Sequence, residues 1–309
     1  MLLGNTVLEE NVIVLVVFFY LLCLVLIVEN GYILIMLASE WARCGMLPPC
    51  DKILTCLSAS RFFLQLVVGG KNLYVLFYPM VFPYNTVHQY FSFQWDFLNS
   101  VTIWSSALLS VFYCVKITTF TYPVFLWLKW RISGYMTWLL LGSLGISFVI
   151  AFLFFIGNYH LYSVYSGKSL LFQNYTGENL KRNLERYYFF PLKVITYSIP
   201  ASIFFLCMVL LITSLERHRK KILHSNSGLW DFRTQAHTRA LKTLLTFSIL
   251  FASYFFALIV NASNILPSEK SWYWGWQVLI YLCTAIHSTF LILNNPRLRD
   301  GLFVRSFQL

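Results

Sequence analysis

Arg61 carries the most demanding chemistry in this sequence, because it stands inside an apolar stretch, "LSASRFFLQ" at residues 57–65. An isolated charge is costly in hydrocarbon, so a guanidinium there has to face other polar groups. Asn30 and Glu29 in the preceding apolar stretch, and polar groups of the last one, are its candidate partners. A hydrogen-bond network that changes partners between two states and a purely structural clamp explain these residues equally well.

Trp95 and Asn99 are four residues apart and therefore share one face of a helix. An indole offers broad apolar area and a π face for a cation, and a carboxamide offers an orienting hydrogen bond. Asp96 lies about 100° around the helix from Trp95. It would form a second wall of a pocket or pair with a basic residue, and the sequence favours neither. The alternative for Trp95 is an aromatic belt at a membrane interface.

The cysteines and histidines form no recognisable metal or catalytic motif. The sequence has no C-x-x-C pair and no Cys/His cluster at metal-ligand spacing. His88, His160 and His287 have no Ser or Asp partner at a recognisable spacing. We therefore expect neither an enzyme nor a bound metal or cofactor.

Composition places these residues in a membrane protein. Of the 309 residues, 58% are hydrophobic and 11% are charged, whereas soluble domains carry about 25% charged residues. The net charge of +11 is no evidence for nucleic-acid binding, because the basic residues are confined to particular loops. We expect an all-α protein with the bilayer as its solvent.

Seven stretches are long and apolar enough to cross a bilayer, which takes roughly 20 residues each. The stretch that holds Arg61 and Gln65 is the weakest of them. Together they predict a single seven-helix domain over residues 1–309. The predicted spans are about 12–37, 52–74, 89–115, 136–157, 189–214, 241–263 and 272–294.

Basic residues predict the orientation of this bundle. Fifteen of the 23 Lys and Arg residues lie in the loops after the first, third and fifth spans or in the tail, and six lie on the opposite side. Cytoplasmic loops carry such an excess of positive charge. We therefore expect an extracellular N-terminus and a cytoplasmic C-terminus.

The stretch "LSVFYCVKITTFTYPVFLWLKWRI" at residues 109–132 resembles the third helix and second cytoplasmic loop of the bitter taste receptors, the type 2 taste receptor family. Within the family, the chain resembles most the branch of members 60 and 41. It departs from the usual "KIANFSH" with "KITTFTY", which predicts a changed efficiency of G-protein coupling. Five more signatures follow in family order: "ENGYI" at 29–33, "LSASRFFLQ" at 57–65, "SIPASIFFLCMVLLITSLERHRKKI" at 198–222, "AHTRALKTLLTFSILFASYF" at 236–255 and "HSTFLILNNPRLR" at 287–299.

The resemblance implies a G-protein-coupled receptor in the plasma membrane. A small bitter ligand would bind between helices 3, 5, 6 and 7, and a gustducin-type G protein would signal through phospholipase C to calcium. The implied ligand-binding residues are Trp95, Asn99, Asp96, Tyr254 and Gln277. Some relatives carry an acid at the position of Gln277, so this neutral residue predicts less reliance on an ion pair with cationic compounds.

The resemblance also implies residues away from the ligand. Pro200, His287 and Ser288 are expected to matter for activation or structure, and Asn174 in "NYT" is a candidate for glycosylation. Basic loop residues would contact the G protein, although anchoring to anionic lipid explains their charge as well. The predicted G-protein contacts are Tyr113, Lys116, Lys129, Arg131, Arg217, Arg219, Lys220 and Lys242.

Two rival classes share this general plan. A type 1 vomeronasal-like receptor would have a similar bundle, but the second-loop signature tells against it. A small-molecule transporter would need a polar lining or broken helices at mid-membrane, and the sequence has one strong intramembrane charge instead. Homo- or hetero-oligomers remain open.

Overall fold

Seven of the helices are long and apolar enough to cross a membrane, so the predicted all-α bundle is confirmed. The computed structural model describes residues 10–78, 86–118, 123–166, 179–180, 182–224, 230–263 and 271–306, and within these ranges every regular element is helical. The elements are α1 (Glu10–Cys44), α2 (Pro49–Phe77), α3 (Thr86–Ile117), α4 (Pro123–Ser166), the π-helical turn η1 (Glu185–Phe189), α6 (Phe190–His224), α7 (Trp230–Ala262), α8 (Ser271–Asn294) and α9 (Pro296–Ser306).

Several helices extend beyond the spans that hydropathy predicted. α4 begins at Pro123 rather than near residue 136, so much of the predicted second loop is helical. Proline suits a first helical turn, because its missing N–H has no intrahelical partner there. α6 continues to His224 and α7 already begins at Trp230. Hydropathy marks only the part that fits hydrocarbon, whereas the helical hydrogen bonds continue past it.

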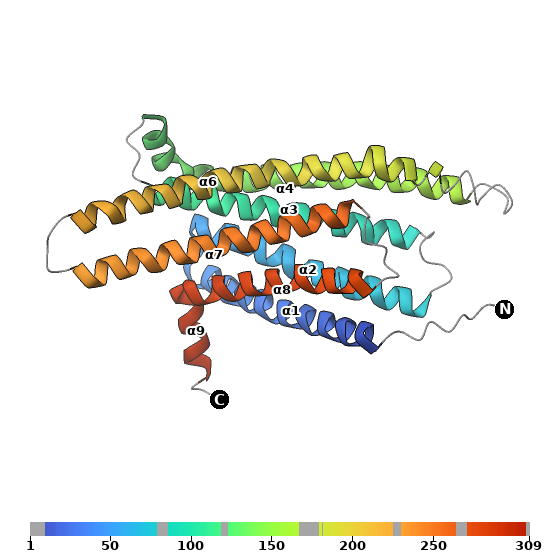
Figure 1. Ribbon diagram of the computed structural model, residues 1–309, viewed down its shortest axis with the longest axis horizontal. Coiled ribbons are helices and arrows are strands. Elements are labelled where there is room, and N and C mark those ends of the chain that lie inside the picture. Colours follow the sequence, from blue (N-terminus) through green and yellow to red (C-terminus); the bar gives the residue numbers. More distant parts are fainter. Residues whose placement is uncertain are drawn as a thin grey trace.

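α9 was missed by the sequence analysis, although its start carries a local signal. The Asn295 side-chain oxygen accepts a hydrogen bond from the Arg297 backbone N–H at 3.1 Å, and Pro296 takes the first position of the helix. Both features are typical of a helix start. α9 turns sharply away from α8 at the end of the bundle opposite the start of α1 (Figure 1).

α3 is the central helix and packs on α2, α4 and α6, while α8 packs on α1 and α7. Small side chains let these helices approach closely, and hydroxyl groups bond across them. Ser60 bonds to Thr102 at 2.9 Å, and Ser100 donates to Ser147 at 3.0 Å. α3 is therefore tied to α2 and α4 by polar contacts inside an otherwise apolar bundle.

The outer and inner faces of the bundle have opposite packing requirements. Large apolar side chains such as Val14, Trp138 and Phe256 point outward and are more than 60% exposed, as a lipid-facing surface requires. Inside, Phe204 on α6 stacks on Phe251 on α7 with ring centroids 3.8 Å apart. Buried aromatic pairs of this kind position α7 against α6 beside the site described next.

Candidate ligand cavity

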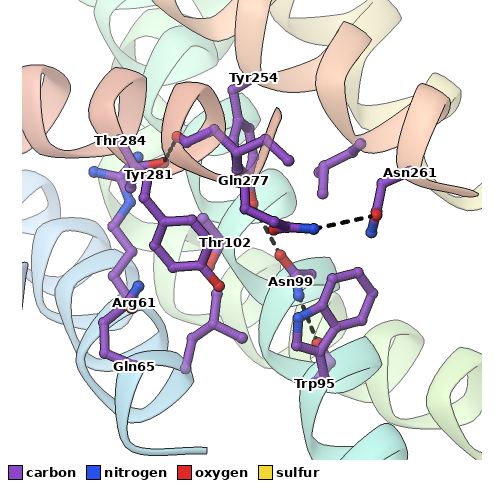
Figure 2. Close-up of a pocket in the computed structure, with 13 residues that line it drawn as sticks. Arg61, Gln65, Trp95, Asn99, Thr102, Tyr254, Asn261, Gln277, Tyr281 and Thr284 are labelled. Carbon is purple, nitrogen blue, oxygen red and sulfur yellow. Dashed lines mark hydrogen bonds between the residues drawn. The ribbon is translucent and has the colours of Figure 1, made fainter. Parts of the chain in front are cut away.

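A cavity lies between α2, α3, α7 and α8 and collects residues from all four helices (Figure 2). Each helix contributes side chains three, four or seven residues apart, which share one helix face. The fifth span, α6, lines none of it, whereas α2 contributes three residues that the sequence analysis did not expect. The lining residues are Arg61, Leu64, Gln65, Trp95, Asn99, Thr102, Tyr254, Leu258, Asn261, Gln277, Ile280, Tyr281 and Thr284.

Four of the five predicted ligand-binding residues meet in this cavity, namely Trp95, Asn99, Tyr254 and Gln277. Asp96 does not line it. Its side chain is buried at 5% exposure, and it interacts electrostatically with Lys193 and Lys71. Of the two interpretations of Asp96, the structure thus supports an interaction with basic residues rather than a pocket wall.

Hydrogen bonds close the cavity across the helices. The Tyr254 hydroxyl on α7 donates to the Asn99 side-chain oxygen on α3 at 3.0 Å, and the Asn99 amide donates to the Trp95 carbonyl at 2.8 Å. On the far side, Gln277 donates to Asn261 at 3.4 Å. Both ends of the Asn99 amide are therefore occupied by the protein itself.

The cavity is small in this state. Its volume is about 20 Å³, which is room for little more than a water molecule. Pockets for drug-sized ligands range from roughly 300 to 1,000 Å³. A larger ligand therefore has to separate side chains that are now in contact, and the Tyr254–Asn99 hydrogen bond is the polar contact that crosses the space.

The π face of Trp95 is already occupied by a cation. The Lys193 ammonium lies 5.5 Å from the centroid of the Trp95 ring and 5.7 Å from that of Phe154, within the range of a cation–π contact. A cationic ligand would have to displace this ammonium to reach the same face. The structure thus weakens the suggestion that the indole receives a cation.

Arg61 finds its partners on α8. It is 5% exposed, and its Nη1 lies 3.1 Å from His287 Nδ1 and 3.1 Å from the Ser288 hydroxyl. The prediction of partners on the last span is confirmed. Asn30 instead donates to the carbonyl of Leu26 in its own helix at 2.8 Å, and within the described ranges it makes no hydrogen bond to Arg61.

Comparison with known proteins decides the family. The family described as Taste receptor protein (TAS2R) matches residues 7–306. The chain belongs to this taste receptor family. Human taste receptor type 2 member 60 is 50% identical over 299 residues, covering 97% of this chain and 94% of the relative. Mouse taste receptor type 2 member 135 is 44% identical over 301 residues, covering 96% of each chain.

Membership settles several predictions. This taste receptor is a G-protein-coupled receptor for bitter small molecules in the plasma membrane and not an enzyme. The likeness to member 60 is confirmed. The taste receptor family matches nearly the whole chain, which rules out the vomeronasal and transporter alternatives.

The predicted G-protein contacts of this taste receptor lie at the ends of α3, α4, α6 and α7 away from the cavity. The Tyr113 hydroxyl lies 3.5 Å from Cys50 Sγ, and Lys116 donates to the Lys129 carbonyl at 3.5 Å. Arg131 contacts the ring of Trp127 and donates to Tyr135. Arg219 pairs with Glu216 at 2.7 Å. The side chains of Arg217, Lys220 and Lys242 are exposed.

Two further predictions concern single residues. Pro200 lies buried inside α6, where it removes one backbone hydrogen bond. Asn174 lies outside the described residues, so its glycosylation stays a prediction.

Polar contacts connect α9 with the start of α2 and with α1, and we call this set of contacts the clamp. The sequence analysis did not predict it. Arg297 on α9 bonds to Asp51 on α2 at 3.2 Å and lies 3.9 Å from Glu40 on α1. The Tyr32 hydroxyl on α1 donates to the Leu298 carbonyl at 2.7 Å. The basic residues of "NNPRLR" were counted among those of a cytoplasmic tail, but nothing local to them indicated these partners.

Proposed function

We propose that this taste receptor binds its bitter ligand in the cavity between α2, α3, α7 and α8, with Trp95 and Asn99 as the principal contacts. The observation that carries the proposal is the convergence of four predicted residues, from three helices, on one buried space. The indole would supply apolar contact area, and the carboxamide would orient a polar group of the ligand. Tyr254 and Gln277 would complete the contacts on the opposite wall.

Activation would follow from opening this space. A ligand that inserts between α3 and α7 replaces the Tyr254–Asn99 hydrogen bond and changes how α7 lies against α3. α7 packs against α6, and both helices extend to the end that carries the basic residues. A ligand can shift this equilibrium only by its differential affinity for the closed and open arrangements.

The charges around the cavity favour uncharged or acidic ligands over cationic ones. Gln277 offers no negative charge, and Lys193 occupies the face of Trp95. Arg61 adds a second cation at the α2 wall. A ligand ammonium would therefore approach two protein cations at close range without a carboxylate among the lining residues.

The signalling partner would be a gustducin-type G protein that acts on phospholipase C and calcium. With the N-terminus outside the cell, the cavity lies in the outer part of the bundle and the exposed residues Arg217, Lys220 and Lys242 face the cytoplasm. The ligand cavity and this basic surface lie on one chain, so a single copy contains the proposed signalling unit. Larger oligomers are not required by it.

The test is a calcium assay in cells that express the chain with a chimeric G protein, screened against a library of bitter compounds. For each agonist found, Trp95→Ala and Asn99→Ala should raise the half-maximal concentration roughly tenfold or more, which corresponds to about 1.4 kcal/mol. Trp138→Ala is the matched control, because that indole is 73% exposed on the outer face. Unchanged potency in both cavity variants, at normal surface expression, would refute the proposed site.

Orientation needs its own measurement. An epitope tag at the N-terminus should be stained on intact cells, and a tag at the C-terminus only after permeabilisation. The opposite pattern would place the cavity on the cytoplasmic side and contradict the proposal.

A further inference from the structure

Arg61 is a buried cation whose hydrogen-bond partners are neutral. It is 5% exposed, and its Nη1 bonds to an imidazole and a hydroxyl, His287 and Ser288. In the part of the chain that the structure describes, no carboxylate lies within 4.0 Å of it. Glu29 on α1 acts on it only at longer range, and one oxygen of that carboxylate accepts a hydrogen bond from Thr289.

The α2 wall of the cavity is incompletely hydrogen-bonded. Arg61 Nε and Gln65 Oε1 are buried and have no hydrogen-bond partner among the described residues. The two residues are one helical turn apart, they are 5% and 2% exposed, and both line the cavity. Figure 2 shows them side by side on α2, facing Tyr281 and Thr284 of α8. Buried polar atoms without partners are rare in folded proteins and call for an explanation.

We propose that this wall of the cavity is an anion site, in which Arg61 Nε binds either a chloride ion or the acidic group of a ligand. The cavity volume of about 20 Å³ admits one small ion. Tyr281 lines the same space, and its hydroxyl can turn a donor toward an anion. The hydroxyls of Thr102 and Thr284 already donate to backbone carbonyls at 2.8 and 2.9 Å and would have to leave them to do the same. Gln65 can present its amide N–H₂ to it, because a carboxamide offers donors and an acceptor from the same group.

An anion explains the site better than a water molecule does. Water would satisfy the free N–H but would leave the guanidinium without a counter-charge in the middle of a bilayer, where unpaired charges are costly. A bound anion satisfies the donor and neutralises the charge together. It also joins α2 to α8 through the groups that face the cavity, in the arrangement described here.

Because an anion that binds only the folded state stabilises that state, the first test needs neither an agonist nor a G protein. The full-length receptor, purified in lipid-containing micelles, is unfolded by heat while chloride replaces gluconate at constant sodium concentration. Chloride should raise the unfolding temperature progressively with the logarithm of its concentration, by about 4 °C or more once chloride is in large excess over its dissociation constant. Failure of this test is thus separate from failure of the proposed ligand response.

A second arm identifies the source of the anionic group. In gluconate buffer, benzoate is compared with benzamide, its uncharged counterpart. Stabilisation by chloride assigns the site to the inorganic ion. Stabilisation by benzoate and not by benzamide, with no chloride effect, assigns it to a ligand's acidic group, and this arm rests on the proposed ligand cavity.

Gln65→Glu provides the decisive variant, because it places a carboxylate one turn from Arg61 without changing the size of the side chain. This built-in anion should abolish the response to chloride and benzoate while the receptor still folds. Gln94→Glu, the same change at an α3 residue that does not line the cavity, should retain the response. The proposal is overturned if neither chloride nor benzoate raises the unfolding temperature, or if Gln65→Glu responds as the natural sequence does.

Discussion

Arg61 on α2, which contacts α8, and Arg297 on α9, which contacts α2, have very different surroundings in the same bundle. Arg61 is 5% exposed, bonds only to neutral groups and keeps one N–H without a partner among the described residues. Arg297 on α9 has a side chain that is 62% exposed, and it pairs with the carboxylate of Asp51 at 3.2 Å. Of these two arginines, the more deeply buried one is therefore the one without a carboxylate in direct contact among the described residues.

The polar groups that form the clamp around Arg297 have hydrogen-bond or ion-pair partners, whereas two buried polar atoms of the cavity wall have none among the described residues. The Tyr32 hydroxyl donates to the Leu298 carbonyl, and α9 approaches α1 so closely at Gly301 that a Cβ there would lie 2.9 Å from the Tyr32 oxygen. Satisfied polar groups and close packing hold one arrangement. Unsatisfied groups beside an open volume leave room for a ligand and for a second arrangement, as expected where binding takes place.

The largest effect should come from removing Arg61. Arg61→Ala deletes both contacts to α8 and leaves a void, with an expected loss of about 2–4 kcal/mol of stability. Surface protein, counted by flow cytometry of a tagged receptor, and the calcium response should both fall severely. Arg186→Ala, an exposed arginine, is the control and should change neither. Normal surface expression with a full response in Arg61→Ala would mean that the buried cation is dispensable.

A smaller effect should follow from opening the clamp. Arg297→Ala leaves the Asp51 carboxylate, whose side chain is 8% exposed, without its ion pair. Since the Arg297 side chain is largely solvated, we expect a loss of about 1 kcal/mol, or a fall of roughly 2–4 °C in the unfolding temperature. Agonist potency should stay unchanged, because the clamp is remote from the cavity.

Arg299→Ala serves as the control for this variant. Among the described residues, the Arg299 side chain pairs only with its sequence neighbour Asp300, and both side chains are at least half exposed. Its unfolding temperature should match that of the natural sequence. Equal losses in Arg297→Ala and Arg299→Ala would show that the clamp adds nothing beyond general surface charge.

The smallest expected effect tests the hydrogen bond that closes the cavity. Tyr254→Phe removes the donor to Asn99 and keeps the aromatic ring. A bond of this kind contributes about 0.6–1.5 kcal/mol. Because it stabilises the closed arrangement, agonist concentrations for half-maximal calcium release should fall roughly threefold or more.

Tyr197→Phe gives the matched comparison. That hydroxyl is also buried but has no hydrogen-bond partner among the described residues, and Tyr197 does not line the cavity. Deleting it should leave potency as it is. If Tyr254→Phe instead raises the agonist concentration required, the hydroxyl contacts the ligand rather than holding the cavity shut.

Much of the fold could be predicted from the sequence, because the signals that define it are local. Seven apolar stretches correspond to seven helices, since the affinity of a stretch for hydrocarbon depends on its own residues. The helix ends could not be predicted so well: α4 extends to Pro123 and α6 to His224 through residues that hydropathy does not recognise. The short helix α9 was missed altogether for the same reason.

The sequence by itself determined that Arg61 must have polar partners and that Trp95 and Asn99 share one face, because both follow from the periodicity of a helix in hydrocarbon. Only the tertiary structure decided that His287, 226 residues away, is a partner and Asn30 is not. It likewise set Lys193 over the ring of Trp95 and placed Gln65 in the cavity wall. Such pairings depend on how whole helices rotate and pack against one another, and no short stretch of sequence contains that information.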